Sequence, residues 1–312
     1  MAESIRVAVV GVGHVGSRHA RLYAEDPQAK LVGVVDIDAE RARSVAERYG
    51  VRAAADVSEL RSEIDAASIA VPTVSHLDVA ARLLQTGVHV LVEKPMASSL
   101  EEAQRLVALA ANKGLVLAAG HTERHNPAVQ ALFRECRDPR FIEVHRLGSF
   151  SPRSLDIDVV LDLMIHDLDV VSSLVGEEVL SLEAVGVPVL TPRVDIANAR
   201  LRFANGAVAN ITSSRVSQDK VRKLRVFERE RYVSLDYQTQ EAVSYRLMRS
   251  GGPRPDIRRE DLEVARDEPL RLELQDFLQA VRNGGRPRVT GEDGLRALGL
   301  ALDVVKAMEA NS

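Results

Sequence analysis

IRVAVVGVGHVG, residues 5–16, decides the fold of this chain. Its first half is a short valine-rich run, which is typical of a strand buried on both faces of a parallel sheet. Its second half is a G-x-G-x-x-G motif, and the residues that follow favour a helix. In such a motif Gly11 permits a tight turn, Gly13 lets a pyrophosphate approach the backbone, and Gly16 lets the helix lie close to the strand. The stretch therefore predicts a strand, a glycine turn and a phosphate-binding helix N-terminus.

An acidic residue stands where a dinucleotide-binding unit requires one. A second apolar run, residues 31–35, ends at Asp36, about 20 residues beyond the last glycine, the usual spacing for a carboxylate that binds the adenosine ribose. A plain glycine turn and a surface Asp would explain either feature alone, but the strand, turn, helix and acid together predict a dinucleotide-binding unit. Because Asp36 and Asp38 would repel a 2′-phosphate, we expect NAD, whereas Arg41 and Arg43 favour the alternative, NADP.

The composition is that of an ordinary globular protein, long enough for two domains. The 312 residues are 46% hydrophobic and 28% charged, with a net charge of −4. Since acidic and basic residues are mixed along the chain, no nucleic-acid partner is expected. No apolar run reaches the ~18 residues that span a bilayer, and the first strand begins too early to leave room for a signal peptide. Cys136 is the only cysteine, so we expect no disulfide, no metal and a cytoplasmic protein.

Strand and helix patterns alternate through the first part of the chain. After residues 5–36, strands are expected at 66–71, 88–92 and 115–119, and helices at 38–49, at 76–85 and after Ser98 or Ser99. This alternation predicts a doubly wound parallel sheet, that is, an α/β Rossmann domain, which we place at residues 1–121.

The pattern changes after Gly120. Helices are expected at 126–137, 160–174, 270–281 and 290–308, strands from Ser181 onward at 197–203, 207–212, 221–228, 232–237 and 242–248, and an exposed loop at 250–255. The clearest hairpin crosses Ala204-Asn205-Gly206, because Asn-Gly is the preferred type I′ pair. We therefore predict an α+β domain at 122–312 with a mostly antiparallel open sheet, with the option that its C-terminal helix packs on the first domain.

Lys94 is the first candidate for chemistry. Oxidation of an alcohol with a nicotinamide cofactor needs a base at the strand ends that takes the hydroxyl proton. Lys94 directly follows a buried strand, where burial and an oxidised nicotinamide would favour the neutral amine and Glu93 would oppose them. Many lysines simply cap a strand at the surface, so position alone leaves both roles open.

A second candidate is the pair Asp162 and His166. The two residues are four positions apart, so they share one face of the helix expected at 160–174. A carboxylate and an imidazole on one face suit a proton relay or the binding of sugar hydroxyls. Two ligands without a third make a poor metal site, and an Asp–His hydrogen bond that only stabilises the fold is the other alternative.

These motifs occur in the order typical of one family. The chain resembles the Gfo/Idh/MocA oxidoreductases in its glycine motif, in Pro72-Thr73 with His76, in GVHVLVEKP at 87–95 and in Asp162-x-x-x-His166. The resemblance covers nearly the whole chain. It implies an NAD(P)-binding domain, a substrate domain whose open sheet makes homodimer or homotetramer contacts, and a reaction on a sugar-like alcohol.

The resemblance also implies roles for individual residues. Lys94 and His166 are the expected catalytic pair, with Asp162 helping to hold the substrate. The expected cofactor-binding residues are Gly11, Val12, Gly13, His14, Val15, Gly16, Asp36, Arg41, Pro72, Thr73, His76, Glu93 and Lys94. The expected substrate-binding residues are His121, Glu123, Arg124, Asn126, Arg153, Asp162 and His166.

Two stretches point to a substrate. Residues 120–128 and 161–167 look most like a branch of the family that oxidises the 3-hydroxyl of UDP-N-acetylglucosamine, whose keto product an aminotransferase would use. Many relatives carry glycines just before the Asp/His motif, whereas this chain has IDVVL at 157–161, so inositol and simple aldoses are less expected. Arg124, Arg146 and Arg153 are expected near the cleft, where arginines bind a diphosphate, although surface arginines are the commoner case.

Three alternatives remain open. The first is an inositol, aldose or other small-alcohol dehydrogenase of the same family. The second is a regulator that binds dinucleotide and sugar without turnover, but a sensor needs no proton-transfer group, so Lys94, Asp162 and His166 favour an enzyme. The third is a dehydrogenase for a non-carbohydrate substrate such as a tetrapyrrole or a cyclic diol, against which the absence of tryptophan argues.

Overall fold

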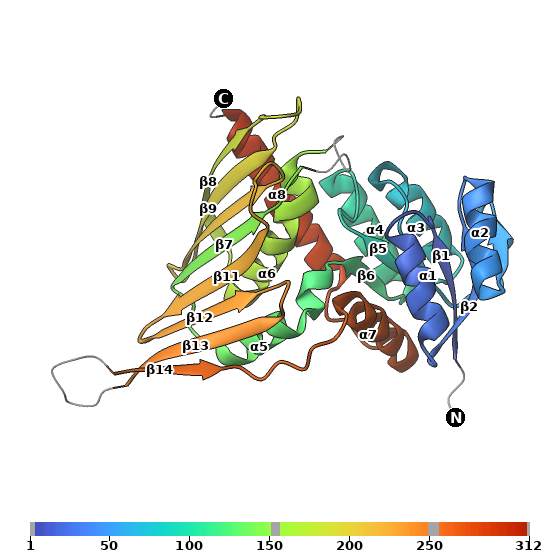
Figure 1. The fold of residues 1–312 in the computed structure, drawn as a ribbon. Helices are drawn as coiled ribbons and strands as arrows, with labels where there is room; N and C mark the ends of the chain where they lie inside the picture. Colours follow the sequence, from blue (N-terminus) through green and yellow to red (C-terminus); the bar gives the residue numbers. More distant parts are fainter. Residues whose placement is uncertain (1–3, 151–156, 249–255, 311–312) are drawn as a thin grey trace. The chain divides into compact units, whose positions relative to one another are not determined.

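The computed structural model describes residues 4–150, 157–248 and 256–310 (Figure 1). The chain forms two compact units, Met1–Thr122 with Pro269–Leu298 and Glu123–Glu268 with Gly299–Ser312. We call them the Rossmann unit and the sheet unit. The sequence placed residues 122–312 in the second domain, with the option that the C-terminal helix packs on the first, and residues 269–298 group with the Rossmann unit. The loop expected at 250–255 lies outside the described residues.

The Rossmann unit holds a six-stranded parallel sheet in the order β3-β2-β1-β4-β5-β6. The strands are β1 Ile5–Val10, β2 Ala29–Val35, β3 Arg52–Ala54, β4 Ala66–Ile69, β5 His89–Glu93 and β6 Leu117–Gly120. This is the doubly wound order of dinucleotide-binding domains, so the predicted fold class is confirmed. The strand order reverses between β1 and β4, and ligands of such sheets bind at the carboxyl ends next to that point. The three-residue β3 was not expected.

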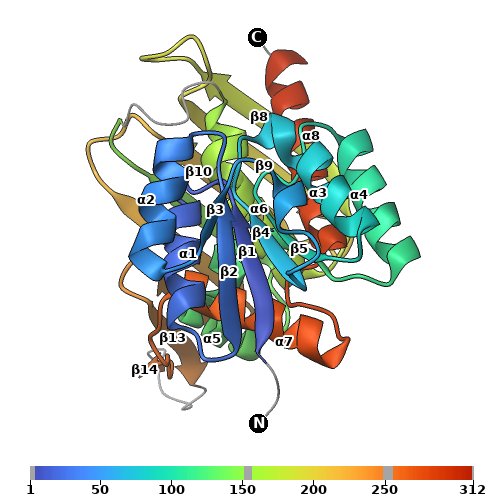
Figure 2. The same cartoon turned by 90° about the vertical axis from the view of Figure 1, so that its right-hand side faces the viewer.

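Helices cover both faces of this sheet, with α1 and α2 on one side and α3 and α4 on the other (Figure 2). The helices are α1 Gly16–Glu25, α2 Ala39–Tyr49, α3 His76–Gln85, α4 Leu100–Lys113 and α7 Pro269–Asn283. Asp38 caps α2 through the Arg41 N–H, and Ser99, rather than Ser98, caps α4. The expected bounds of α2 and α3 are confirmed to within one residue.

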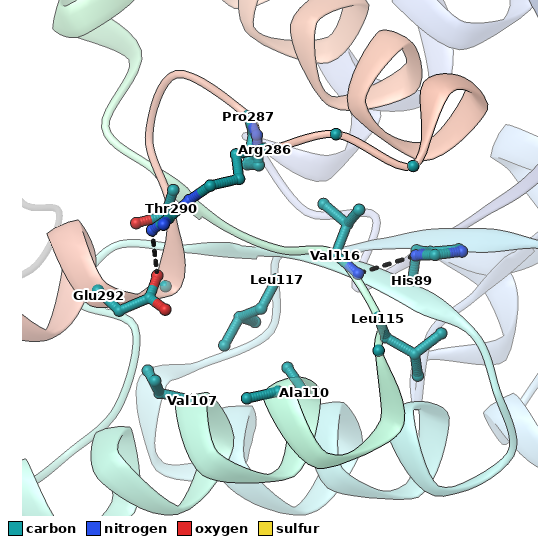
Figure 3. A pocket seen from close by; sticks show the side chains of 15 residues that line it. His89, Val107, Ala110, Leu115, Val116, Leu117, Arg286, Pro287, Thr290 and Glu292 are labelled. Atoms are coloured by element: carbon teal, nitrogen blue, oxygen red, sulfur yellow. Dashed lines mark hydrogen bonds and ion pairs between the residues drawn. The ribbon is translucent and has the colours of Figure 1, made fainter.

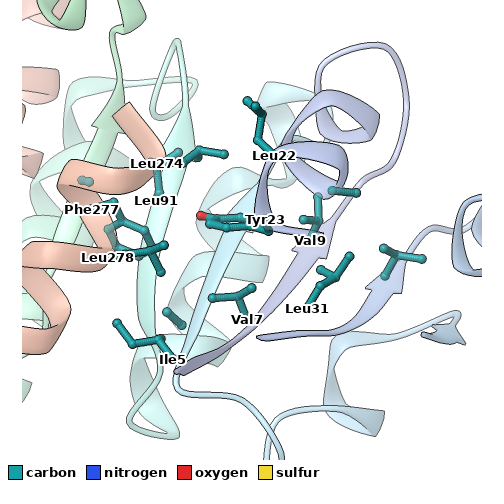
Figure 4. Close-up of a cluster of buried hydrophobic side chains, with 14 of the residues drawn as sticks. Ile5, Val7, Val9, Leu22, Tyr23, Leu31, Leu91, Leu274, Phe277 and Leu278 are labelled. Carbon is teal, nitrogen blue, oxygen red and sulfur yellow. The ribbon is translucent and has the colours of Figure 1, made fainter. Parts of the chain in front are cut away.

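A cluster of apolar side chains joins the sheet to α1 and α7 (Figure 4). Val7 and Val9 of β1 lie with Tyr23 of α1, and Phe277 and Leu278 of α7 are buried in the same cluster. The Tyr23 hydroxyl lies 2.7 Å from the Ser68 hydroxyl, so its polar end is satisfied inside the core. Since each fully buried Leu or Phe contributes about 1.5–3 kcal/mol, α7 is an integral part of the Rossmann core.

The sheet unit holds an eight-stranded mixed sheet in the order β14-β13-β12-β11-β7-β10-β9-β8. Its strands are β7 Phe141–Leu147, β8 Val179–Val187, β9 Ile196–Phe203, β10 Val208–Ser214, β11 Val221–Glu228, β12 Arg231–Asp236, β13 Glu241–Met248 and β14 Asp256–Asp261. Only β7 and β10 pair in parallel, so the predicted mostly antiparallel sheet is confirmed among the described residues. The edge strand β14 was not expected.

One face of this sheet carries helices. Figure 1 shows α5, Pro127–Glu135, and α6, Ile165–Val175, on the same side, together with the end of α8, Gly291–Ala310. Residues on β7 alternate accordingly, with Ile142 and Val144 fully buried toward the helices. α8 begins at the expected Thr290 cap, whose hydroxyl accepts the Asp293 N–H. Within the described ranges, no helix combines the length and apolarity that a membrane crossing needs.

The turn between β9 and β10 differs from the expected type I′ turn. The Phe203 N–H donates to the Ala207 carbonyl and the Gly206 N–H donates to the Phe203 carbonyl, so the loop contains three residues. Gly206 has φ +82°, but Asn205 is not left-handed, as a type I′ turn would require. The extra residue Ala204 explains the difference, because a three-residue loop needs a single left-handed position, and glycine supplies it.

Candidate active site

The glycine loop provides a cradle for a pyrophosphate. A Cβ at Gly11, whose φ is +82°, would lie 2.6 Å from the Ala70 carbonyl oxygen, and a Cβ at Gly16 would overlap the Gly11 carbonyl. A Cβ at Gly13, in contrast, would meet no protein atom within 4 Å. The outer glycines are therefore required by the protein itself, whereas Gly13 leaves open space above the loop. No side chain caps α1 after Val15, so a phosphate suits its N-terminus, and these residues fit a dinucleotide.

Asp36 is fixed beside this loop. Its carboxylate is buried and accepts the Val12 N–H and the Asp38 N–H, each at 2.9 Å. The Arg41 guanidinium lies 3.3 Å from Asp36 and 2.9 Å from Asp38. The Asp36 carboxylate is thus held next to the glycine loop, where its contact with the adenosine ribose stays a prediction, and the Arg41 cation is already paired with two carboxylates. The expected cofactor residue His14 lies 3.1 Å from the Arg18 side chain.

Glu93 ends β5 and directly precedes Lys94. Its carboxylate lies 3.1 Å from Nε2 of His19, a fully buried residue of α1. Burial raises the pKa of Glu93, but the hydrogen bond with His19 and the charges of His19 and Lys94 lower it more, so the pKa lies below its usual value. A Cβ at Gly120 on β6 would lie 3.0 Å from the Glu93 carboxylate, so this glycine makes room for it. The Glu93 carboxylate therefore places a negative charge next to Lys94, the candidate base.

His19 was missed by the sequence reasoning. It follows the last motif glycine by three positions, on the face of α1 that packs against the sheet. A histidine on the otherwise apolar buried face of a helix is the signal that would have identified it, since a buried imidazole requires a polar partner.

His76 contacts the protein rather than open space. The residue is buried, and its ring nitrogens lie 2.9 Å from the carbonyl oxygens of Val71 and Pro95. Burial lowers the pKa of His76, and a neutral ring donates one of these two hydrogen bonds. His76 therefore ties the segment after β4 to the segment after β5, and its contact with the cofactor stays a prediction. Pro72 and Thr73 belong to the segment after β4, where Pro72 precedes a short helical turn at Thr73–Ser75.

A π-helical turn carries the first member of the Asp/His pair. Residues Val160–Met164 form this turn, in which the Ile165 N–H donates to the Val160 carbonyl, and α6 continues from Ile165. Asp162 lies in the π-turn and His166 in the first turn of α6, and both are half-buried. The sequence predicted one regular helix here. Single π-turns are frequent at functional sites, which supports a functional role for this segment.

Two of the expected substrate arginines are neutralised inside the sheet unit. Arg146 is buried and donates to Asp167 at 2.6 and 2.9 Å and to Glu123 at 3.0 Å. Burial lowers the pKa of Arg146, but these carboxylates outweigh it and hold the pKa well above its usual value. Arg124 pairs with Asp169 at 3.2 Å and with Ser173. Both guanidinium groups are therefore bound to carboxylates of the sheet unit, their contact with a substrate stays a prediction, and Arg153 lies outside the described residues.

Glu123 and Asn126 also serve the protein interior. Asn126 caps α5 by accepting the Ala128 N–H, and its amide donates to Glu123 at 3.1 Å and to the Tyr237 carbonyl at 3.0 Å. With Glu123 bound to Arg146 as well, both expected substrate residues form part of the internal network. The expected substrate residue His121 is buried directly after β6 in the Rossmann unit, where its N–H donates to the Ala119 carbonyl.

A pocket in the Rossmann unit lies at the amino ends of the parallel strands (Figure 3). His89 and Leu117 line it from the first residues of β5 and β6, with Pro287 and Thr290 opposite. The amino ends of parallel strands do not bind dinucleotides, so this pocket is not the candidate site. Among the described residues, no three His, Cys, Asp or Glu side chains gather as metal ligands.

A parallel sheet of Rossmann order with a dinucleotide loop, followed by a large mixed sheet with an Asp/His turn, defines the class of two-domain nicotinamide-dependent oxidoreductases. The chain belongs to the Gfo/Idh/MocA oxidoreductase family. Residues 5–121 match its NAD-binding Rossmann domain and residues 156–312 match its C-terminal alpha/beta domain. The protein is therefore an oxidoreductase with an NAD(P)-binding domain, which confirms the family prediction.

Among similar proteins is UDP-N-acetylglucosamine 3-dehydrogenase of Acidithiobacillus ferrooxidans, 42% identical over 308 residues that cover 98% of each chain. A solved structure of that enzyme matches with a TM-score of 0.94 over 99% of both chains. An inositol 2-dehydrogenase of Rhizobium meliloti is 26% identical over 98% of this chain and 97% of its own. A levoglucosan dehydrogenase structure, 20% identical with a TM-score of 0.88 over 99% of this chain and 98% of its own, shares the fold.

Proposed function

We propose that this protein oxidises the 3-hydroxyl of UDP-N-acetylglucosamine to a ketone with NAD as the acceptor. The observation that carries the proposal is the 42% identity, over 98% of both chains, to an enzyme named for that reaction. The more distant inositol 2-dehydrogenase, at 26% identity, supports the alternative substrate class less strongly. The bulky residues 157–161 before the Asp/His turn favour the same choice.

The proposed chemistry assigns one task to each residue. When bound, NAD⁺ supplies the acceptor for the hydride that leaves the alcohol carbon. The Lys94 amine takes the hydroxyl proton as the carbon–oxygen double bond forms, and Glu93, held by His19, places a negative charge next to the protonated amine. His166 and Asp162 bind the reacting hydroxyl and its neighbour and fix their orientation. The glycine loop and Asp36 hold the dinucleotide.

NAD rather than NADP is proposed because of the charges around Asp36. Two carboxylates, Asp36 and Asp38, lie where a 2′-phosphate would bind, and both accept hydrogen bonds from Arg41. An arginine already paired in this way is a weak partner for a phosphate. Titration should show tighter binding of NADH than of NADPH, and a tenfold preference for NADPH would contradict the assignment.

The substrate is tested by NADH formation. Purified protein is incubated with NAD⁺ and UDP-N-acetylglucosamine, free N-acetylglucosamine, glucose or myo-inositol, with a carbonyl trap that removes the ketone. We expect turnover of the UDP-sugar above all others. Turnover of inositol or glucose without the UDP-sugar would reject the substrate and keep the dehydrogenase, whereas cofactor binding without turnover of any of them favours a regulator.

We also propose self-association through the helix-free face of the large sheet. Phe141, Phe227, Tyr232 and Tyr245 form a ladder on that face, with ring centroids 5.7, 4.8 and 5.4 Å apart. Such an aromatic surface favours contact with a second copy. Light scattering should show a dimer or tetramer, and a monomer at micromolar concentration would contradict this. We further propose that the protein is cytoplasmic and that an aminotransferase consumes the keto sugar.

A further inference from the structure

Four polar side chains form a row across the helix-covered face of the large sheet. Ser213 on β10 is opposite Arg146 on β7, and Arg146 is opposite Arg222 on β11. The N–H of Tyr237, next after β12, donates to the Arg222 carbonyl, which extends the row by one strand. Directly opposite residues share a face of a sheet, and Val144 and Leu224, two positions along, are fully buried on this one. We call Ser213, Arg146, Arg222 and Tyr237 the polar row.

The polar row lies beside the π-helical turn that carries Asp162. The π-helical turn Val160–Met164, which carries Asp162, packs against β10, the strand of Ser213. Asp162 is also close enough to Arg222 to act on its charge. Arg222 therefore shares its surroundings with a residue that the proposed function places on the substrate.

Arg222 differs from its neighbour Arg146. Arg146 is bound to Asp167 and Glu123, whereas the described residues provide no ion pair and no side-chain hydrogen bond for Arg222. Burial and the positive charge of Arg146 lower the pKa of Arg222, although Glu123, Asp167 and Asp162 oppose them. The Ser213 hydroxyl in the same row is fully buried and has no hydrogen-bond partner among the described residues. Arg222 is half-buried, so its side chain, which has no protein acceptor among the described residues, keeps surface for a polar ligand.

The charges decide what kind of ligand fits. Arg146 and Arg222 carry two positive charges, and Glu123, Asp167 and Asp162 carry three negative ones. This surrounding does not favour a diphosphate, which needs an excess of cations. An uncharged sugar ring fits better, because its oxygens accept hydrogen bonds from a guanidinium and its hydroxyls donate to a carboxylate.

We propose that Arg222 is a substrate-binding residue that donates hydrogen bonds to an uncharged oxygen of the sugar ring, a hydroxyl or an acetamido carbonyl, next to Asp162. The assignment rests on the proposed function for the identity of the sugar. Of the two arginines in the polar row, Arg222 is the one without an ion pair among the described residues.

The test compares Arg222→Met with Arg225→Met. Arg225 lies on the same strand but on the opposite face, where it pairs with Glu143 at 3.0 Å, so it controls for the loss of an arginine from β11. Binding of UDP and of UDP-N-acetylglucosamine to the NADH-loaded protein is measured by calorimetry, and thermal melts verify folding. We expect Arg222→Met to weaken the binding of UDP-N-acetylglucosamine about tenfold or more, while UDP binding and the control variant stay unchanged.

The other possible results contradict either the sugar contact of Arg222 or the proposed substrate. Equal weakening of UDP and the UDP-sugar would move the Arg222 contact to the diphosphate, and no weakening of either would make Arg222 a structural cation. If the wild-type protein binds neither compound, the proposed substrate fails. The KM of Arg222→Met for whichever sugar or cyclitol the wild type oxidises then decides the role of Arg222. A rise of about tenfold supports the sugar contact, and an unchanged KM rejects it.

Discussion

The glycine loop and the polar row are built in opposite ways. The glycine loop takes its function from residues that are neighbours in the sequence, because Gly11, Gly13 and Gly16 shape one continuous turn. The polar row takes its function from residues on separate strands, since Arg146 and Arg222 meet only through the pairing of β7 with β11. A local motif needs the correct spacing, whereas a row across a sheet needs the correct register. The first kind of site is therefore readable from sequence and the second is not.

The largest expected effect concerns Lys94, which belongs to the Rossmann unit, where sequence motifs predict the structure well. Lys94→Ala should leave NADH affinity nearly intact and lower kcat about 100-fold or more, because the group that takes the hydroxyl proton is lost. Stopped-flow or steady-state NADH formation on the proposed substrate measures this. Lys113→Ala, at an exposed position of α4, is the matched control. Near-native turnover of Lys94→Ala would remove lysine from the mechanism.

Particular residues show how far sequence reasoning reaches. The Ser99 cap and the bounds of α2 and α3 follow from short-range rules, and the structure contains all of them to within one residue. The π-turn at Val160–Met164 was not predicted, because periodicity does not separate a π-turn from a regular helix.

The arginines of the sheet unit show the limit. Arg146 was expected near the cleft because arginine binds phosphate, but its partner Asp167 lies on α6 and its partner Glu123 precedes α5. Pairing across such distances depends on tertiary packing. The alternation with Leu224 and Val226 puts Arg222 on the covered face and Arg225 on the open one. The sequence does not show, however, that Arg222 lies opposite Arg146, because that depends on the register between β7 and β11.

A glycine series sharpens the comparison within the local motif. Gly13→Val should keep the fold and weaken NADH binding about tenfold or more, because a Cβ there meets no protein atom within 4 Å and the side chain would fill the space that a pyrophosphate needs. Gly11→Ala should instead lower the melting temperature, since its Cβ would lie 2.6 Å from the Ala70 carbonyl. Calorimetric titration and thermal melts separate the two outcomes. Native NADH affinity in Gly13→Val would place the pyrophosphate elsewhere.

The smallest expected effect tests the far edge of the Rossmann sheet, where no chemistry is assigned. Nδ1 of His89 accepts the Val116 N–H at 2.9 Å, and burial lowers the pKa of His89, although Asp65 opposes this. Because the folded protein then holds the proton more weakly than the unfolded chain, stability is unaffected above the unfolded pKa of about 6.5 and falls as the pH drops below it. His76, whose pKa burial also lowers, acts in the same direction.

His89→Gln isolates this contribution, because glutamine offers an acceptor oxygen to the Val116 N–H and does not titrate. Between about pH 7.5 and pH 5.5, the melting temperature of the wild type should fall more than that of His89→Gln, by no more than about 2 °C for this half-buried group. Turnover at pH 7.5 should be unchanged, since the proposed site lies at the carboxyl ends of the strands and His89 begins β5 at its amino end. An equal pH dependence in both proteins would mean that His89 keeps its ordinary proton affinity, and a loss of turnover would mean that the two edges of the sheet are coupled.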